Sequence, residues 1–489
     1  MITGREAWRL PRAAALGGVA VSVAGMILIG LCRPPAAVPT MDGAGLFPRL
    51  GWSPEPDLSV TVLLWASMIV GTLGTAAGLL ALHRGWRPRS GPVLAGAAGA
   101  VVLLVAAPPM GTTDPMDYAA YGRMAVLGLN PHVTTPGDFR GTGDPVGVLA
   151  PREWEDIPSV YGPVATGAQW AASKLGGTSA ARTVLWLKIM NGIAFLAVAL
   201  CLNRLAGARR VRVHLLWTLN PLLLWALIGG AHVDGLAAAL AVGGLAVLGP
   251  GTALRGRAGL VRAAAAGLLL GAAAGVKLPY VLVGAGMVWT LRRSPRCLAV
   301  LGAGAVAALT AGYAVVGPSA IEVVVRRGGM PSWNTPWQLV LSGSAPGWLT
   351  WGALALAVVA GAALLRLPTG APPWPGPALA ICLAWVITAP VYYPWYEALV
   401  FPLIALAPAS RLDVLHLGRA FVATVAALPG VVCRLGDSWL RAAVLDGPVT
   451  SLAPVALLVL ALLLVGGALA RARVEAPAGR GAGRSVVTG

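Results

Sequence analysis

The chain has 489 residues, of which 57% are hydrophobic and only 11% are charged. Soluble domains carry about 25% charged residues, so this composition excludes a soluble or disordered protein. The net charge of +18 is unusual, but its basic residues do not gather on one exposed domain, which excludes a nucleic-acid-binding surface. Long apolar stretches recur along the whole chain and predict an all-α polytopic membrane protein.

The apolar stretches predict about 12–14 transmembrane helices, because a bilayer core needs about 20 helical residues. Several stretches are shorter than that, so the number depends on how many of the short ones cross. In chain order the candidates are 13–31, 58–82, 92–110, 183–205, 213–230, 235–249, 263–276, 279–291, 297–316, 348–365, 378–391, 398–409, 417–432 and 452–470.

Charge sets the orientation of these helices. With a cytoplasmic N-terminus, the arginine-rich loops all fall inside, which is the positive-inside pattern. Of the 18 acidic residues, only Glu6, Asp413 and Glu475 fall on that side. We therefore expect a multi-pass protein of the cell membrane with both termini in the cytoplasm, and contact between its basic loops and anionic lipid head groups.

The domain organisation follows from the same pattern. Residues 1–470 are expected to form a single transmembrane domain, and the basic, Gly- and Ala-rich tail 471–489 is expected to be disordered. The first apolar segment, 13–31, has no clear cleavage site and is expected to be a retained anchor. The five cysteines show no metal-binding spacing, which gives no reason to predict a disulfide or a metal centre.

The longest polar stretch is the loop 111–182, predicted to lie outside the cell and to carry short helices. It begins TTDPMDYAAYGRM, in which Asp114 before a proline is typical of a helix N-cap. On that helix Asp114, Asp117, Tyr118 and Tyr121 would share one face. Capping alone would explain both carboxylates. The alternative is that Asp114 is a general base, since a carboxylate can take a proton from an attacking hydroxyl.

A second polar motif is GGAHVDG, at 229–235, in the outer turn between two spans. Its His232 and Asp234 have two interpretations. Asp234 could simply cap the following helix. Alternatively, the pair could hold a substrate hydroxyl or the catalytic loop.

The third motif is GAAAGVKLPY, at 271–280. The apolar segments on either side of it are too short to span comfortably, which predicts a hairpin dipping in from the cytoplasm with Lys277 at its outer tip. An isolated ammonium at the membrane boundary suits a phosphate. A lysine at a helix end can also extend its charge to the interface without any function.

Two weaker candidates lie near the C-terminal half. Arg326 in the outer loop 317–347 could bind a phosphate, although a solvated surface arginine is the simpler interpretation. The stretch YYPWYEAL, at 392–399, places Trp395, Tyr396 and Glu397 at the outer interface. An aromatic belt explains the rings, but it does not explain Glu397, which could bind a sugar hydroxyl.

These motifs, in this order, resemble those of the actinobacterial polyprenol-phosphomannose-dependent α-1,6-mannosyltransferases, which are integral-membrane glycosyltransferases of the C superfamily. The similar stretches are TTDPMDYAAYGRMAVLGLNPHVTTP, DIPSVYGPVATGAQW, GGAHVDGL, GVKLPYVL and PWYEALVFPL. Two positions depart from the family pattern: His132 stands where a tyrosine is usual, and Val233 replaces an asparagine.

The resemblance implies a bundle like that of the C superfamily and a reaction on the outer membrane face. The donor would be polyprenyl phosphomannose and the acceptor a glycan or glycolipid; no nucleic acid partner is expected. Asp114 matches the family's catalytic aspartate, and Asp117 is a secondary candidate. Lys277, with Arg123 or Arg326, would bind the donor phosphate. The expected substrate-binding residues are Tyr118, Tyr121, Tyr161, His232, Asp234, Trp395, Tyr396 and Glu397.

The expected chemistry is a single displacement at C1 of the mannosyl phosphate, which would give an α-linkage from a β-donor. A base contributes about 10²–10⁴ in rate to such a step. The sequence leaves a divalent metal open, because an aspartate beside a phosphate binds Mg²⁺ in other enzymes. The alternative functions are a transporter or flippase of a lipid-linked saccharide, for which we find no internal repeat, and a structural scaffold.

Overall fold

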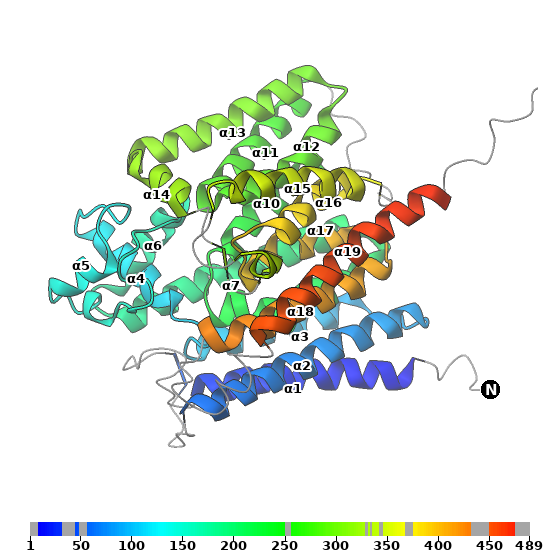
Figure 1. Cartoon of the computed structure of the whole chain (residues 1–489), viewed down its shortest axis with the longest axis horizontal. Helices are drawn as coiled ribbons and strands as arrows, with labels where there is room; N and C mark the ends of the chain where they lie inside the picture. Colours follow the sequence, from blue (N-terminus) through cyan, green and yellow to red (C-terminus); the bar gives the residue numbers. More distant parts are fainter. Residues whose placement is uncertain are drawn as a thin grey trace, which may run out of the picture.

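The computed structural model describes residues 8–31, 45–47, 56–249, 256–327, 331–332, 335–341, 346–366, 375–431 and 449–474. Over these ranges the chain is helical and contains no strand, in agreement with the predicted fold class. Figure 1 shows long helices packed into a bundle, with a group of short helices extending from one side.

The helices follow one another along the whole described chain. The N-terminal part contains α1 (Arg9–Leu31), α2 (Pro56–His83), α3 (Ser90–Ala106), α4 (Asp114–Val126), α5 (Pro136–Gly141), η1 (Gly147–Leu149), α6 (Pro163–Gly176) and α7 (Ala180–Leu205). The middle contains η2 (Gly207–Arg209), α8 (Arg210–Val213), η3 (His214–Thr218), α9 (Pro221–Leu223), η4 (Leu224–Gly229), α10 (Asp234–Leu248), α11 (Gly256–Val276), η5 (Leu278–Val283) and α12 (Gly284–Leu291). The C-terminal part contains α13 (Pro295–Val316), α14 (Ser319–Arg327), η6 (Pro336–Leu339), α15 (Leu349–Leu364), α16 (Pro375–Thr388), η7 (Pro394–Leu399), α17 (Phe401–Leu406), α18 (Arg411–Val431) and α19 (Thr450–Val474).

Six of these helices are long and apolar enough to cross a bilayer: α1, α2, α7, α11, α13 and α19. A seventh candidate is the pair 207–218 and 221–229, which bends by 44° at the break before Pro221, because a proline cannot continue the preceding helix. The predicted 12–14 spans exceed this number. The difference lies in shorter apolar helices of 10–17 residues, such as α3, α10 and α16, which fall short of the full bilayer thickness.

Small residues let the long helices approach closely. A Cβ added to Gly18 on α1 would lie 2.9 Å from the Cα of Gly74 on α2, and one added to Gly267 on α11 would lie 2.1 Å from the carbonyl oxygen of Leu301 on α13. Helices in lipid gain their association energy from such close contact, because burial of apolar surface gives no advantage there. The glycine-rich composition therefore has a packing role in these pairs.

The region around Lys277 differs from the predicted hairpin of two short arms. The first arm is α11, which begins at Gly256 and is long enough to span, whereas the second is broken into η5 and α12. The break follows Lys277 directly, because Pro279 lacks the N–H that would continue the ladder. Lys277 therefore lies at the end of a full-length helix.

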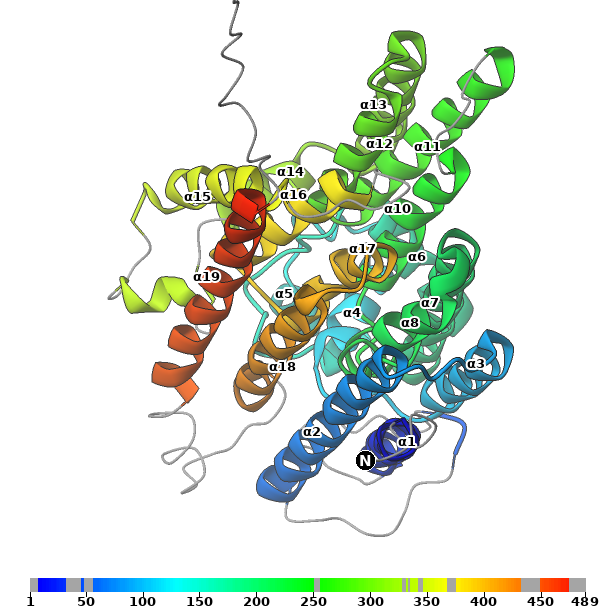
Figure 2. The same cartoon turned by 90° about the vertical axis from the view of Figure 1, so that its right-hand side faces the viewer.

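The predicted long loop 111–182 forms a compact group of short helices, α4, α5 and α6, at one side of the bundle (Figure 1). In Figure 2, a quarter turn away, the same group lies on the far side of the bundle, behind longer helices. Helix α6 packs against α4 and α7, and α7 also contacts α3 and α10. Helix α7 therefore joins the polar group to the transmembrane bundle.

Candidate active site

The candidate site begins where α3 ends and α4 starts. Asp114 is the first residue of α4, and Thr113 lies at the N-cap position of that helix. Instead its carboxylate accepts hydrogen bonds from the Thr112 hydroxyl, at 2.9 Å, and from the Tyr118 hydroxyl, at 3.2 Å. The N-cap position, one of the two interpretations of Asp114, is therefore occupied by Thr113 instead, and the Asp114 carboxylate bonds to two side-chain hydroxyls.

The protonation of Asp114 is set mainly by burial. The side chain is almost fully buried, and desolvation of the charged form raises the pKa of Asp114 to about 6. The hydrogen bonds from Thr112 and Tyr118 and the charge of Lys277 lower this pKa, whereas the charge of Asp234 raises it. Asp114 is therefore mostly ionised at neutral pH and still basic enough to accept a proton.

Tyr118 connects Asp114 to two other segments. Its hydroxyl lies 3.1 Å from the Tyr161 hydroxyl and 3.0 Å from Nδ1 of His232. Nδ1 of His232 also lies 3.5 Å from the Asp114 carboxylate. Burial, together with the charge of Lys277, holds the pKa of His232 well below its usual range, so the imidazole is neutral. The ring therefore serves as a polar neighbour of Asp114 without neutralising it.

Asp234 and Lys277 form the second half of the cluster. The Lys277 ammonium lies 2.9 and 3.0 Å from the two carboxylate oxygens of Asp234, and the Tyr280 hydroxyl donates to the backbone carbonyl of Asp234 at 3.1 Å. The N-cap position of α10 is Val233, so Asp234 is the first residue of that helix rather than its N-cap. Lys277 is also not the isolated cation that the sequence predicts, because Asp234 balances its charge.

Aromatic rings close the cluster from the C-terminal half of the chain. The Trp395 ring stacks on His232 with 3.6 Å between centroids. The Lys277 ammonium lies 3.8 Å from the centroid of the Tyr396 ring, which is a close cation–π contact. These contacts give Trp395 and Tyr396 positions beside the polar groups rather than in a belt facing lipid.

Glycine allows the segments to meet. A Cβ added to Gly162 would lie 2.3 Å from the carbonyl oxygen of Gly275, and the Gly162 N–H donates to the Val276 carbonyl at 3.1 Å. The Tyr-Gly-Pro motif is thereby held against the end of α11, with Tyr161 on one side and Lys277 on the other. Only a residue without a side chain fits this approach.

The second predicted carboxylate, Asp117, makes no hydrogen bond to this cluster. It is buried, and neither carboxylate oxygen has a hydrogen-bond partner among the described residues. Burial, together with the charges of Asp114 and Glu153, raises its pKa well above the usual range. Tyr121, one turn further along α4, donates to the Ile157 carbonyl. Asp114 and Tyr118 therefore bond within the cluster, whereas Tyr121 bonds to the loop at Ile157.

Three other predicted residues do not belong to the cluster, or their side chains lie outside the described residues. Arg123 is paired with Asp144 at 2.9 Å, within the polar group. Arg326 belongs to α14, but its side chain lies outside the described residues. Glu397 is fully buried and accepts from the Tyr392 hydroxyl at 2.6 Å, while His416 and Arg419 surround it.

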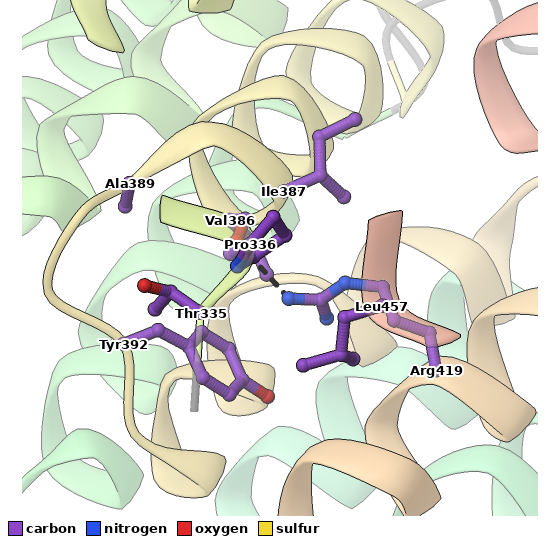
Figure 3. A pocket seen from close by; sticks show the side chains of 8 residues that line it. All are labelled: Thr335, Pro336, Val386, Ile387, Ala389, Tyr392, Arg419 and Leu457. Atoms are coloured by element: carbon purple, nitrogen blue, oxygen red, sulfur yellow. Dashed lines mark hydrogen bonds between the residues drawn. The ribbon is translucent and has the colours of Figure 1, made fainter. Parts of the chain in front are cut away.

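A small pocket adjoins the Glu397 group. Figure 3 shows the Arg419 guanidinium directed toward Val386, to whose backbone carbonyl it donates at 3.0 Å. The lining residues are Thr335, Pro336, Val386, Ile387, Ala389, Tyr392, Arg419 and Leu457. None of them is a predicted site residue, so this pocket is separate from the cluster around Asp114.

Sequence reasoning overlooked two members of the cluster, Thr112 and Tyr280. Both stand beside residues that it singled out, in TTDP and KLPY, so closer attention to their hydroxyls would have found them. No group of three or more His, Cys, Asp or Glu side chains that could hold a metal occurs in the described part of the chain.

Comparisons with known proteins identify the family of the chain. Residues 15–293 match the profile of the alpha-(1→6)-mannopyranosyltransferase N-terminal domain. The matched residues make up more than half of the chain. The chain belongs to this family. The match includes Asp114, Tyr118, Tyr161, His232, Asp234 and Lys277, whereas Trp395 and Tyr396 lie beyond it.

Curated relatives are similar over a shorter range. The chain is 32% identical over 158 residues to a probable alpha-(1→6)-mannopyranosyltransferase of Mycolicibacterium smegmatis, covering 32% of this chain and 27% of the relative. It is 30% identical over 156 residues to the alpha-(1→6)-mannopyranosyltransferase of Mycobacterium tuberculosis, 31% of this chain and 26% of the relative. It is 32% identical over 146 residues to alpha-(1→6)-mannopyranosyltransferase B of Corynebacterium glutamicum, covering 29% of this chain and 24% of the relative. The matched segment thus spans about a quarter of each relative.

Proposed function

We propose that the protein transfers a mannosyl residue from polyprenyl phosphomannose to a glycan or glycolipid hydroxyl, with inversion, forming an α-1,6-type linkage. The observation that carries the proposal is the state of Asp114. Its carboxylate is buried, accepts only from hydroxyl donors and has a pKa of about 6. A general base works best when its pKa lies near the working pH.

In this proposal Asp114 takes the proton of the acceptor hydroxyl as that oxygen attacks C1 of the mannose. Tyr118 holds the carboxylate in place and, through its contact with His232, fixes the ring beside it. Asp117 does not act as the base, because the raised pKa favours its neutral form. Base assistance of this kind contributes about 10²–10⁴ in rate.

Lys277 receives the departing phosphate. As the C1–O bond breaks, charge grows on the phosphate oxygens, and a fixed ammonium stabilises that charge. Asp234 keeps the ammonium oriented before the donor arrives, and Tyr280 keeps Asp234 in place. Trp395 and Tyr396 offer flat apolar faces on which a sugar ring packs, whereas Glu397 is committed to Arg419 and His416 and has a structural role.

The direct test is incubation of purified protein in liposomes with radiolabelled polyprenyl phosphomannose and an α-mannan acceptor. We expect labelled product with an α-1,6 linkage, and roughly 10²–10⁴-fold less product from Asp114→Asn. Asp138→Asn is the matched control, because Asp138 is an exposed carboxylate of the same group of short helices, and its side chain accepts only from Thr135 at the start of α5. If labelled donor moves between the leaflets and no product forms, the proposed transferase function is wrong and the alternative, a flippase, is supported.

The orientation is part of the proposal. The positive-inside pattern favours a site on the outer membrane face. Val133 is exposed in the same polar group, so a single cysteine at this position should react with a membrane-impermeant maleimide in intact cells. Reaction only after the cells are opened would place the site in the cytoplasm.

A further inference from the structure

Two buried polar side chains on α7 take no part in the proposed chemistry. Lys188 is 1% exposed and Asn191 is 4% exposed, and they lie about one turn apart on a long apolar helix. Ionisable groups are costly at such depth. Their hydrogen bonds show what they do there.

Lys188 binds the segment that leads to Asp114. Its ammonium donates to the carbonyls of Leu104, at 2.7 Å, and Ala107, at 2.6 Å. These are carbonyls at the C-terminal end of α3, where the helix leaves its last acceptors without intrahelical partners. The chain then runs through residues 108–113 directly to Asp114. Lys188 therefore fixes the point from which the segment of the proposed base departs.

Asn191 binds the segment that leads to His232. Its side-chain amide donates to the Ala231 carbonyl at 3.0 Å. Ala231 has a φ of 51° and is the only non-glycine residue with positive φ in the described part of the chain. A non-glycine residue in this region is strained and needs its surroundings to hold it. Asn191 is therefore one of the groups that hold the turn immediately before His232.

The two segments also touch each other. The Met110 N–H donates to the Gly229 carbonyl at 3.2 Å, and a Cβ added to Gly230 would lie 2.7 Å from Cγ2 of Thr112. A shift of either segment would therefore change the contact of Asp114 and Tyr118 with His232. Helix α7 is the common support, because it holds one segment through Lys188 and the other through Asn191.

We propose that Lys188 and Asn191 are positioning residues that lock the Asp114 segment and the His232 segment to the same helix and so set the geometry of the base. This inference rests on the proposed function. A displacement of about 1 Å at a reacting group can cost roughly 100-fold in rate. Loss of either tether should therefore lower kcat with little change in the KM for the donor.

The experiment compares Lys188→Met and Asn191→Leu, which keep side-chain size and lose the donor, with Lys188→Arg, which keeps a cationic donor. Arg262→Met is the matched control, because Arg262 donates to the Val247 and Leu248 carbonyls at the far end of the helix that begins with Asp234. For each purified variant we would measure kcat, KM, the pH profile and amide hydrogen exchange over 110–114.

We expect kcat to fall roughly 10- to 100-fold in Lys188→Met and Asn191→Leu, with recovery in Lys188→Arg and no change in Arg262→Met. The acidic limb of the pH profile should move to lower pH in Lys188→Met, because water admitted to Asp114 reduces the desolvation that raises its pKa. Turnover within about threefold of wild type in both tether variants would overturn the proposal.

Hydrogen exchange separates this inference from the proposed function. If the wild-type protein transfers no mannose, the function is wrong, but faster exchange over 110–114 in Lys188→Met would still support the tether. Unchanged exchange in that segment would contradict the tether even in a fully active transferase.

Discussion

Two buried acidic groups in this protein have opposite surroundings. Glu397 is fully enclosed and has Arg419, His416 and the Tyr392 hydroxyl around its carboxylate. Asp114 is buried as well, but its hydrogen bonds come from two hydroxyls and its basic neighbour His232 is neutral. A carboxylate whose charge is balanced by an arginine is a poor base, whereas one held only by hydroxyls can still accept a proton. The comparison teaches that the partners of a buried carboxylate, rather than its burial, indicate its role.

The strongest way to test the comparison is to neutralise each carboxylate in turn. Asp114→Asn should lower turnover about 10²–10⁴-fold, the contribution of a general base, while the amount of folded protein stays near wild type. Burial already disfavours the charged form of Asp114, so a neutral amide is tolerated. Turnover by radiolabel transfer and monodispersity in detergent measure the two effects. Retained turnover would remove Asp114 from the role of base.

Glu397→Leu should act on folding instead. Removal of one member of a buried ion pair costs about 3–5 kcal/mol, because Arg419 is left without its counter-charge. We expect a lower yield of folded protein and a lower melting temperature, and Asp413→Leu, which strips Arg212 of its partner, should behave similarly. If the Glu397→Leu protein is stable but has much lower turnover, Glu397 binds substrate rather than stabilising the fold.

The pH dependence sharpens the comparison further. Because the pKa of Asp114 is about 6, transfer should fall as the pH drops through 6, when the carboxylate takes up a proton and loses its basicity. The Thr112 hydroxyl lowers this pKa, so Thr112→Val should move the acidic limb to higher pH. Initial rates between pH 5 and 8 measure the shift. A limb that stays in place in the variant would contradict the assignment to Asp114.

The smallest expected effect concerns the outer edge of the cluster. Tyr161→Phe removes a neutral hydrogen bond to Tyr118 and leaves the bond from Tyr118 to Asp114 intact. Such bonds contribute about 0.5–1.5 kcal/mol, so turnover should fall only about two- to tenfold. Tyr118→Phe, which removes the bond to Asp114 itself, should cost more. Equal losses in the two variants would show that Tyr161 acts directly on substrate.

Much of the candidate site could be predicted from the sequence. Charged or polar residues at the ends of apolar helices are rare, so Asp114, His232, Asp234 and Lys277 stood out individually. What the sequence could not show was their pairing. It predicted Lys277 as an isolated cation and left Asp114 open between a helix cap and a general base, because it carries no information on which distant carboxylate or hydroxyl would face each group.

Lys188 shows most clearly that the sequence does not predict contacts between distant segments. A lysine within an apolar span is visible in the sequence, but its bonds to Leu104 and Ala107 depend on how α7 packs against α3. The number of membrane-spanning helices could not be predicted from the sequence for a related reason. Helices α3, α10 and α16 can end early at a proline, a glycine or a polar turn only where neighbouring helices satisfy the freed backbone groups. The packing of those neighbours therefore decides the helix lengths.

The sequence by itself determined the membrane class, the helical fold and the family, because apolar length and motif order are local properties of the chain. Only the tertiary structure decided which of two buried carboxylates received an arginine and which kept its basicity. The physical reason is that pairing and desolvation depend on side chains from several separate segments, and no single segment encodes the approach of the others.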